Sequence, residues 1–133
     1  MDGSKVNYLA VLAAALSSFL IGGIWYSPIL FARAWMREAG IPEERLRENV
    51  AGVFAGSFVL SLLVALNLAF FLGRAAGVAW GMGAGALAGI GWATASLATV
   101  FLFERRSKTL ILIDGGYLAV SYTVMGALIG VIQ

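Results

Sequence analysis

The fold is decided by residues 75–103, AAGVAWGMGAGALAGIGWATASLATVFLF, in which none of the 29 residues is charged. About 20 apolar residues are enough for a helix to cross a hydrocarbon core of about 30 Å. A barrel strand would instead alternate apolar and polar side chains. The stretch therefore predicts a transmembrane helix near residues 77–103. It is longer than the core requires, so we expect it to tilt or to project into the headgroups.

Three further segments pass the same length test. The charges leave 27 uncharged residues between Lys5 and Arg33, 25 between Glu48 and Arg74, and a last segment after Lys108 whose only charge is Asp114. We predict an all-α fold, a bundle of four membrane spans near residues 6–26, 50–72, 77–103 and 109–132. The first span is too long for a signal-peptide core and is followed by no small-residue cleavage site, so we expect it to be retained.

The composition supports a single transmembrane domain over residues 1–133. Hydrophobic residues make up 61% of the chain and charged residues 12%, against about 45–50% and about 25% in soluble domains. A soluble domain and a disordered chain are both excluded. The absence of cysteine and histidine removes disulfides, thiolates and the commonest metal ligand and general base.

The basic residues predict the orientation. The segments 27–49 and 104–108 carry seven of the nine Lys and Arg residues, and the opposite side carries only Lys5 and Arg74. By the positive-inside rule, both segments are cytoplasmic and both termini lie outside.

The segment between the first two spans predicts two short helices. Ser27 and Pro28 are typical of a helix start, and Gly40 of a helix end. Between them, apolar and basic residues alternate with a helical period, so we expect an amphipathic helix over residues 28–39 in the membrane interface, anchored by Trp35. A second helix is expected to begin after Pro42 and to continue without a break into the second span.

Small residues recur at four-residue spacing on every predicted span. The most regular row, on the third span, consists of Gly77, Gly81, Gly85 and Gly89 and continues to Ala93. The fourth span has a shorter row, Gly126 and Gly130. In lipid, helices associate through close backbone contact at small residues. Either the rows pack the helices of one chain, or one of them, with the third-span row as the strongest candidate, faces a second copy in a homo-oligomer.

Asp114 is the only ionisable residue within an apolar run, and Gly115 and Gly116 follow it. An ionisable residue at membrane depth indicates a functional site. Asp114 either caps a helix that begins at Gly115, with Arg105, Arg106 or Lys108 neutralising its charge, or carries a proton or an ion. The candidate polar site comprises Asp114, Asn67, Tyr117 and Arg105. Other deep polar groups are expected to form interhelical hydrogen bonds or to line a narrow pathway.

The sequence contains no paired carboxylates, phosphate-binding loop, nucleophile–base set or metal-ligand cluster. We therefore expect no enzyme activity, no catalytic residue, no metal and no cofactor. A net charge of +2 without a long basic run argues against nucleic acid. Small multidrug transporters have four spans of similar size but need a carboxylate in the first span, where this chain has none.

Several short motifs resemble those of an uncharacterised membrane family, DUF1761. They cover nearly the whole chain: Asn7–Tyr8, Trp25–Tyr26–Ser27–Pro28–Ile29–Leu30–Phe31 with Trp35, Leu102–Phe103–Glu104–Arg105, Leu112–Ile113–Asp114–Gly115–Gly116–Tyr117 and Val124–Met125–Gly126–Ala127. The resemblance implies a small multi-pass protein of the bacterial inner membrane and supplies no reaction. In the family pattern a histidine follows Gly-Gly-Tyr. Leu118 takes its place here, which argues against a titrating imidazole.

Two classes of function follow. The first is a homo-oligomeric pore or carrier for a small solute or ion in the lipid bilayer, suggested by the glycine rows and the carboxylate. The second is a non-catalytic subunit or assembly protein that docks on a larger membrane complex.

Overall fold

The computed structural model describes residues 6–74 and 76–133, so Lys5 lies outside the described residues. Within them the chain is helical without strands, and four helical segments are long and apolar enough to cross a membrane. This confirms the predicted all-α four-span bundle. The segments are α1 (Tyr8–Trp25), α4 (Val50–Leu72), the third span Val78–Phe103 and α7 (Lys108–Ile132).

Side-chain caps fix where the first and last spans begin. The Asn7 side-chain oxygen accepts hydrogen bonds from the backbone N–H groups of Leu9 and Ala10, at 2.9 and 3.3 Å. The Ser107 hydroxyl accepts the Leu110 N–H at 3.1 Å. Each cap satisfies N–H groups that the first turn of a helix leaves without a partner. As a result α7 begins at Lys108, well before Asp114.

The third span is not one uniform α-helix. It consists of α5 (Val78–Ala88), a π-helical turn η2 (Gly89–Thr94) and α6 (Ala95–Phe103). A π-turn inserts a wider turn into an α-helix and shifts the side chains that follow it. Hydropathy alone predicted the length of this span but not its interruption.

The segment between α1 and α4 differs from its prediction at two points. The amphipathic helix α2 (Ala32–Ala39) begins four residues later than the predicted start at Pro28, because residues 27–31 form turns instead. It ends as predicted at Gly40, which adopts the left-handed conformation with φ 71°. The predicted continuous second helix is wrong: α3 (Glu43–Leu46) stops, and Asn49, with φ 48°, redirects the chain into α4.

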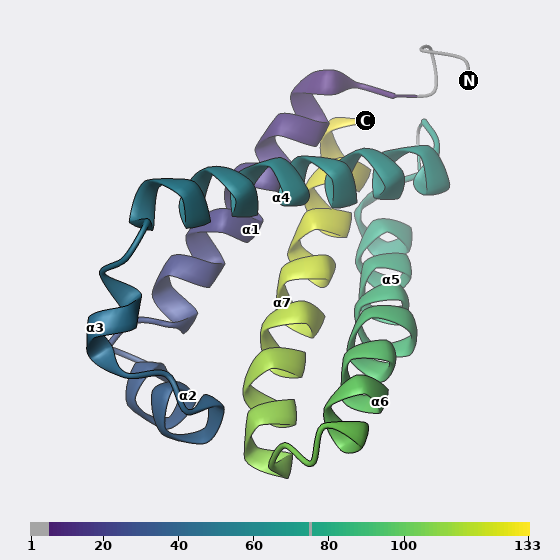
Figure 1. The fold of residues 1–133 in the computed structure, drawn as a ribbon. Coiled ribbons are helices and arrows are strands. Elements are labelled where there is room, and N and C mark those ends of the chain that lie inside the picture. The colour runs from purple at the N-terminus through teal and green to yellow at the C-terminus, as the bar shows by residue number, and fades with distance from the viewer. Residues whose placement is uncertain (1–5, 75) are drawn as a thin grey trace.

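The helix α7 occupies the middle of the bundle, packing on α1 along one side and on α5 along the other, while α4 crosses them (Figure 1). The core lies where α1, α7 and the second half of α4 meet. Residues with no exposed surface there include Ala10, Ala14, Ala65, Ala69 and Ile129. We call this the closed end.

The Gln133 side chain joins three elements at the closed end. Its carbonyl oxygen accepts the Asn7 N–H at 2.8 Å. Its amide group donates to the carbonyl oxygens of Ala69, at 2.9 Å, and Gly73, at 2.8 Å. The side chain therefore ties the beginning of α1 and the end of α4 to the end of α7.

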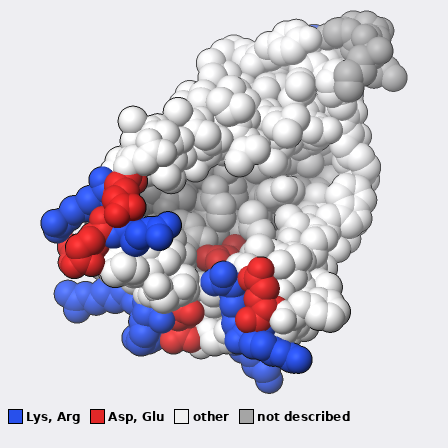
Figure 2. Space-filling view, in the orientation of Figure 1, with Lys and Arg blue, Asp and Glu red and all other residues white. Residues whose placement is uncertain are grey.

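The opposite end carries α2, α3 and the α6–α7 turn, and nearly all charged residues on the face shown gather there (Figure 2). We call it the charged end. The segments 27–49 and 104–108 thus lie on one side of the bundle, and residues 6 and 133 lie on the other.

Candidate functional site

A groove of about 620 Å³ opens between α1 and the first half of α4. Figure 2 shows the surface hollowed beside the charged end. Aromatic rings line it where α1, α2 and α7 meet, apolar side chains line its flanks, and α4 adds two hydroxyl groups: the main residues are Tyr26, Trp35, Tyr117, Phe19, Leu20, Ile24, Val53, Phe54, Ser57 and Ser61. The groove is thus apolar along its flanks and polar at selected points.

Two consecutive aromatic residues at the end of α1 hydrogen-bond to two consecutive residues of α7. The Trp25 indole N–H donates to the Ile113 carbonyl oxygen at 2.8 Å. The Tyr26 hydroxyl donates to Oδ1 of Asp114 at 2.7 Å. These bonds hold the end of α1 against the second turn of α7 and place the Tyr26 ring at the groove.

The two glycines after Asp114 lie directly against side chains of two different helices. A Cβ atom on Gly115 would lie 2.6 Å from the Thr94 methyl carbon, and one on Gly116 would lie 2.9 Å from the Trp25 ring. The Thr94 hydroxyl, in the π-turn, also donates to the Gly115 carbonyl oxygen at 3.0 Å. Glycine at both positions therefore lets α1 and the third span approach α7 at the same level.

Tyr117 and two buried serines form the next layer of contacts. The Tyr117 hydroxyl donates to the Ser18 carbonyl oxygen at 3.2 Å and lies 3.1 Å from the Ser18 hydroxyl. Ser121, only 1% exposed, donates to that same hydroxyl at 2.7 Å. A Cβ atom on Gly22 would lie 3.3 Å from the Tyr117 ring. The small residue on α1 makes room for Tyr117 beside the groove.

Asp114 does not cap a helix. Since α7 begins at Lys108 with Ser107 as its cap, Asp114 lies in the second turn, and the cap interpretation is wrong. The ion pairs found among residues 6–74 and 76–133 do not include Asp114, and Arg106 pairs with Glu104 at 2.7 Å. Asp114 is half-buried, and its identified hydrogen-bond donor is the Tyr26 hydroxyl.

The four candidate polar residues do not form one site. Asp114 and Tyr117 are brought together by Tyr26, whose ring centroid lies 5.6 Å from that of Tyr117. Asn67 donates to the Leu63 carbonyl oxygen of its own helix at 2.8 Å and lines a separate cavity of about 290 Å³. Arg105 lies exposed in the α6–α7 turn with φ 61°.

Tyr26 was not predicted as a site residue, and Trp35 was predicted only as an anchor in the membrane interface. The ring centroids of these two residues lie 4.8 Å apart. The available signal was the concentration of aromatic residues at the predicted end of the first span. That signal gave no indication that they would meet Asp114, 88 residues later in the chain.

The glycine rows of the third and fourth spans face each other within one chain. A Cβ atom on Gly85 would overlap the Tyr122 carbonyl oxygen, and one on Gly81 would overlap that of Gly126. In return, a Cβ atom on Gly126 would overlap the Gly81 carbonyl oxygen, and one on Gly130 that of Gly77. The backbones of α5 and α7 are therefore in contact, and this row is not free to face a second copy.

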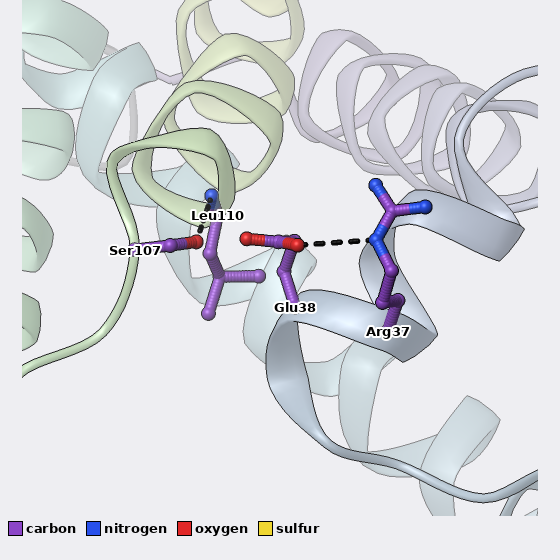
Figure 3. Close-up of polar contacts among 4 residues, drawn as sticks. All are labelled: Arg37, Glu38, Ser107 and Leu110. Carbon is purple, nitrogen blue, oxygen red and sulfur yellow. Dashed lines mark hydrogen bonds and ion pairs between the residues drawn. The ribbon is translucent and has the colours of Figure 1, made fainter.

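The end of α2 lies beside the cap of α7, as Figure 3 shows for Glu38 and Ser107. Glu38 pairs with Arg37 at 3.2 Å. Hydrogen bonding from the Ser107 hydroxyl, followed by that from Arg37, lowers the pKa of Glu38. The Glu38 carboxylate thus connects α2, which carries Trp35, to the beginning of α7.

The model of one protein family, described as a protein of unknown function (DUF1761), matches residues 9–130. The match includes Trp25, Tyr26, Trp35, Asp114 and Tyr117. None of the curated proteins and none of the solved structures matches the chain.

Proposed function

The chain belongs to the DUF1761 family, and we propose that it is a membrane protein that binds a small amphipathic solute in the groove and carries it across the bilayer. The observation that carries the proposal is the groove itself, about 620 Å³ between α1 and α4. Ligand sites are typically concave, mostly apolar and provided with a few polar groups. Phe19 and Phe54 supply apolar walls here, and Ser57 and Ser61 supply hydroxyl groups.

A carrier fits this geometry better than a pore along the axis of one chain. The backbone contact between α5 and α7 at Gly85 and Gly126 leaves no passage between these helices. The groove instead lies to one side, between helices that are packed closely at the closed end. A change in the position of α2 or of the first half of α4 would open it toward the charged end.

The groove can be filled without disturbing the bundle. Gly23 lines the groove, and a Cβ atom there would meet nothing within 4 Å. Gly83, on α5 and outside the groove lining, is equally open. We therefore expect Gly23→Phe to abolish most solute binding, measured by calorimetry in detergent, and solute uptake into liposomes. Gly83→Phe is the matched control. Equal binding and uptake by wild type and Gly23→Phe would refute the proposal.

The alternative, a subunit that docks on a larger membrane complex, makes a different prediction for the same pair of variants. A helix of a partner would occupy the groove, because a mostly apolar groove also suits an apolar helix. A membrane partner would then co-purify with wild type and Gly83→Phe and be lost from Gly23→Phe. Solute binding by the isolated chain would be absent.

We propose that the charged end faces the cytoplasm of a bacterial cell and that both termini lie outside. The segments carrying seven of the nine basic residues support this orientation by the positive-inside rule. Reporter fusions after Gln133 and in the turn between Glu104 and Lys108 test it. A cytoplasmic signal from the fusion after Gln133 would contradict it.

Assembly into a homo-oligomer stays a prediction from the sequence. The strongest candidate row, including Gly81 and Gly85, packs against α7 of the same chain, so any contact between copies must use another face. Mass analysis in a mild detergent tests the prediction. A defined oligomer would support it, and a monomer would contradict it.

A further inference from the structure

Three aromatic rings meet at the end of the groove nearest α2. The Tyr26 ring lies 4.8 Å from the Trp35 ring and 5.6 Å from the Tyr117 ring, measured between centroids, with interplanar angles of 57° and 59°. All three side chains line the groove. Aromatic faces carry partial negative charge and attract cations, and groups of such rings bind quaternary ammonium ions.

A carboxylate stands behind this aromatic group. Asp114 accepts a hydrogen bond of 2.7 Å from the Tyr26 hydroxyl. A hydrogen bond from a phenol to an anion shifts electron density toward the ring, so it strengthens the attraction between that ring and a cation. Two basic side chains of the charged end have acidic partners: Arg106 pairs with Glu104 at 2.7 Å, and Arg37 pairs with Glu38 at 3.2 Å.

The remainder of the groove suits hydrocarbon. This part is lined by Phe19 and Leu20 of α1 and by Val53 and Phe54 of α4. The Phe19 and Phe54 rings also meet edge to face, with centroids 5.8 Å apart. An apolar region continuous with an aromatic, carboxylate-backed end is complementary to a molecule with an alkyl part and a positively charged head.

We propose that the groove binds amphipathic organic cations, with the cationic head against Tyr26, Trp35 and Tyr117 and the hydrocarbon part between α1 and α4. This inference rests on the proposed solute-binding function and specifies its substrate class. Asp114 acts through Tyr26 and is a positioning residue for the head group.

Three probes with the same alkyl chain test the substrate class: octyltrimethylammonium, octyl sulfate and octanol. Binding to the purified full chain is measured by calorimetry, below the critical micelle concentration of each ionic probe and below the solubility limit of octanol. The cation should bind at least tenfold more tightly than either other probe. Trp35→Leu should weaken cation binding roughly tenfold, Trp35→Phe should weaken it less, and octanol binding should change little in either variant.

Asp114→Asn separates the charge from the hydrogen bond. The Asn side-chain oxygen can still accept the Tyr26 hydroxyl, so the fold should persist, as circular dichroism and the melting temperature would show. Cation binding should weaken severalfold while octanol binding is unchanged. Trp92→Leu, which alters an exposed ring outside the groove lining, is the control and should leave all three affinities unchanged.

The outcomes test solute binding in the groove and the preference for organic cations separately. If no probe binds in a manner sensitive to Gly23→Phe, solute binding in the groove is refuted. If the probes bind in the groove but octanol or octyl sulfate binds as tightly as the cation, only the cationic substrate class is refuted. Unchanged cation selectivity in both Trp35→Leu and Asp114→Asn would also overturn the assignment of the head-group position.

Discussion

The two halves of α4 pack differently at the closed end and at the charged end. At the closed end, Ala65 and Ala69 of α4 have no exposed surface. In the first half of the same helix, Val53 and Phe54 are each 57% exposed. One helix therefore belongs to the core at one end and to the wall of a groove at the other.

The difference shows how small residues govern the shape of a membrane bundle. Where glycines face each other, as at Gly85 and Gly126, the backbones come into contact. Near the charged end, α1 still contacts α7 at Gly116, but the first half of α4 is separated from α1 by the groove that the rings of Tyr26 and Tyr117 line. Because lipid gives helices little hydrophobic reason to associate, side-chain size decides where contact is made.

Disrupting the backbone contact between α5 and α7 should have the largest effect on stability. Gly85→Leu would place a side chain against the Tyr122 carbonyl oxygen, so we expect a loss of about 3 kcal/mol or more in the free energy of unfolding. Thermal unfolding in detergent, followed by circular dichroism, measures it. Gly83→Leu on the same helix, where a Cβ meets nothing within 4 Å, should unfold like wild type. Equal melting temperatures for both variants would contradict the α5–α7 contact.

Removing the amide of Gln133 should destabilise the closed end by a smaller amount. Gln133→Ala removes hydrogen bonds to Asn7, Ala69 and Gly73, which at about 0.6 kcal/mol each in a membrane protein amounts to about 2 kcal/mol. Asn67→Ala is the control, since that exposed amide bonds to its own helix. A larger loss of stability in the Asn67 variant than in the Gln133 variant would contradict the conclusion that the Gln133 hydrogen bonds hold the closed end together.

At the charged end, Asp114 tests how firmly α1 is held to α7. Asp114→Leu leaves the Tyr26 hydroxyl without its acceptor and should cost about 1–2 kcal/mol. Asp114→Asn keeps an acceptor and should cost less than about 0.5 kcal/mol. Chemical unfolding monitored by tryptophan fluorescence compares the two. If both variants lose the same stability, the negative charge rather than the hydrogen bond holds the helices together.

The smallest effect concerns acidification and the position of α2. The Ser107 hydroxyl and Arg37 lower the pKa of Glu38 in the folded state. Their stabilising effect is therefore present above the unfolded-state pKa of about 4.3 and is lost as the pH falls through the lower folded-state value. The protection of α2 against hydrogen exchange, relative to the intrinsic exchange rate at each pH, should fall in that acidic range.

Two variants isolate this contribution. Glu38→Gln should remove the acid-dependent loss of protection of α2. Glu43→Gln alters a carboxylate that pairs with Arg47 next to α3 and should leave the profile of α2 unchanged. An identical acid response in wild type and Glu38→Gln would show that another group is responsible.

Hydropathy and charge spacing were sufficient to predict the spans, because the membrane imposes a minimum apolar length. The predicted second span, residues 50–72, coincides with α4. Local signals at Gly40 also located the end of α2 correctly. The break at Asn49 was missed because asparagine can adopt the left-handed conformation without any motif to announce it.

The candidate site could be predicted only in part. Asp114 was singled out because a charge in an apolar run is costly. Its hydrogen-bond donor, Tyr26, is 88 residues away in the chain, and no local pattern relates the two. The four-residue spacing of the glycines likewise indicated a close helix–helix contact. It did not indicate which helix is contacted, because the spacing describes only the face on which the glycines lie.

The contacts of Asp114, Gly115, Gly116 and Tyr117 with different neighbours have a consequence for how the length of the chain can vary. One residue inserted between Ser107 and Asp114 would rotate the remainder of α7 by about 100° relative to its cap. Either the cap or all four contacts would then be lost together. Insertions and deletions should therefore be excluded from this part of α7 and tolerated in the exposed residues 42–49, where no packed face depends on the count.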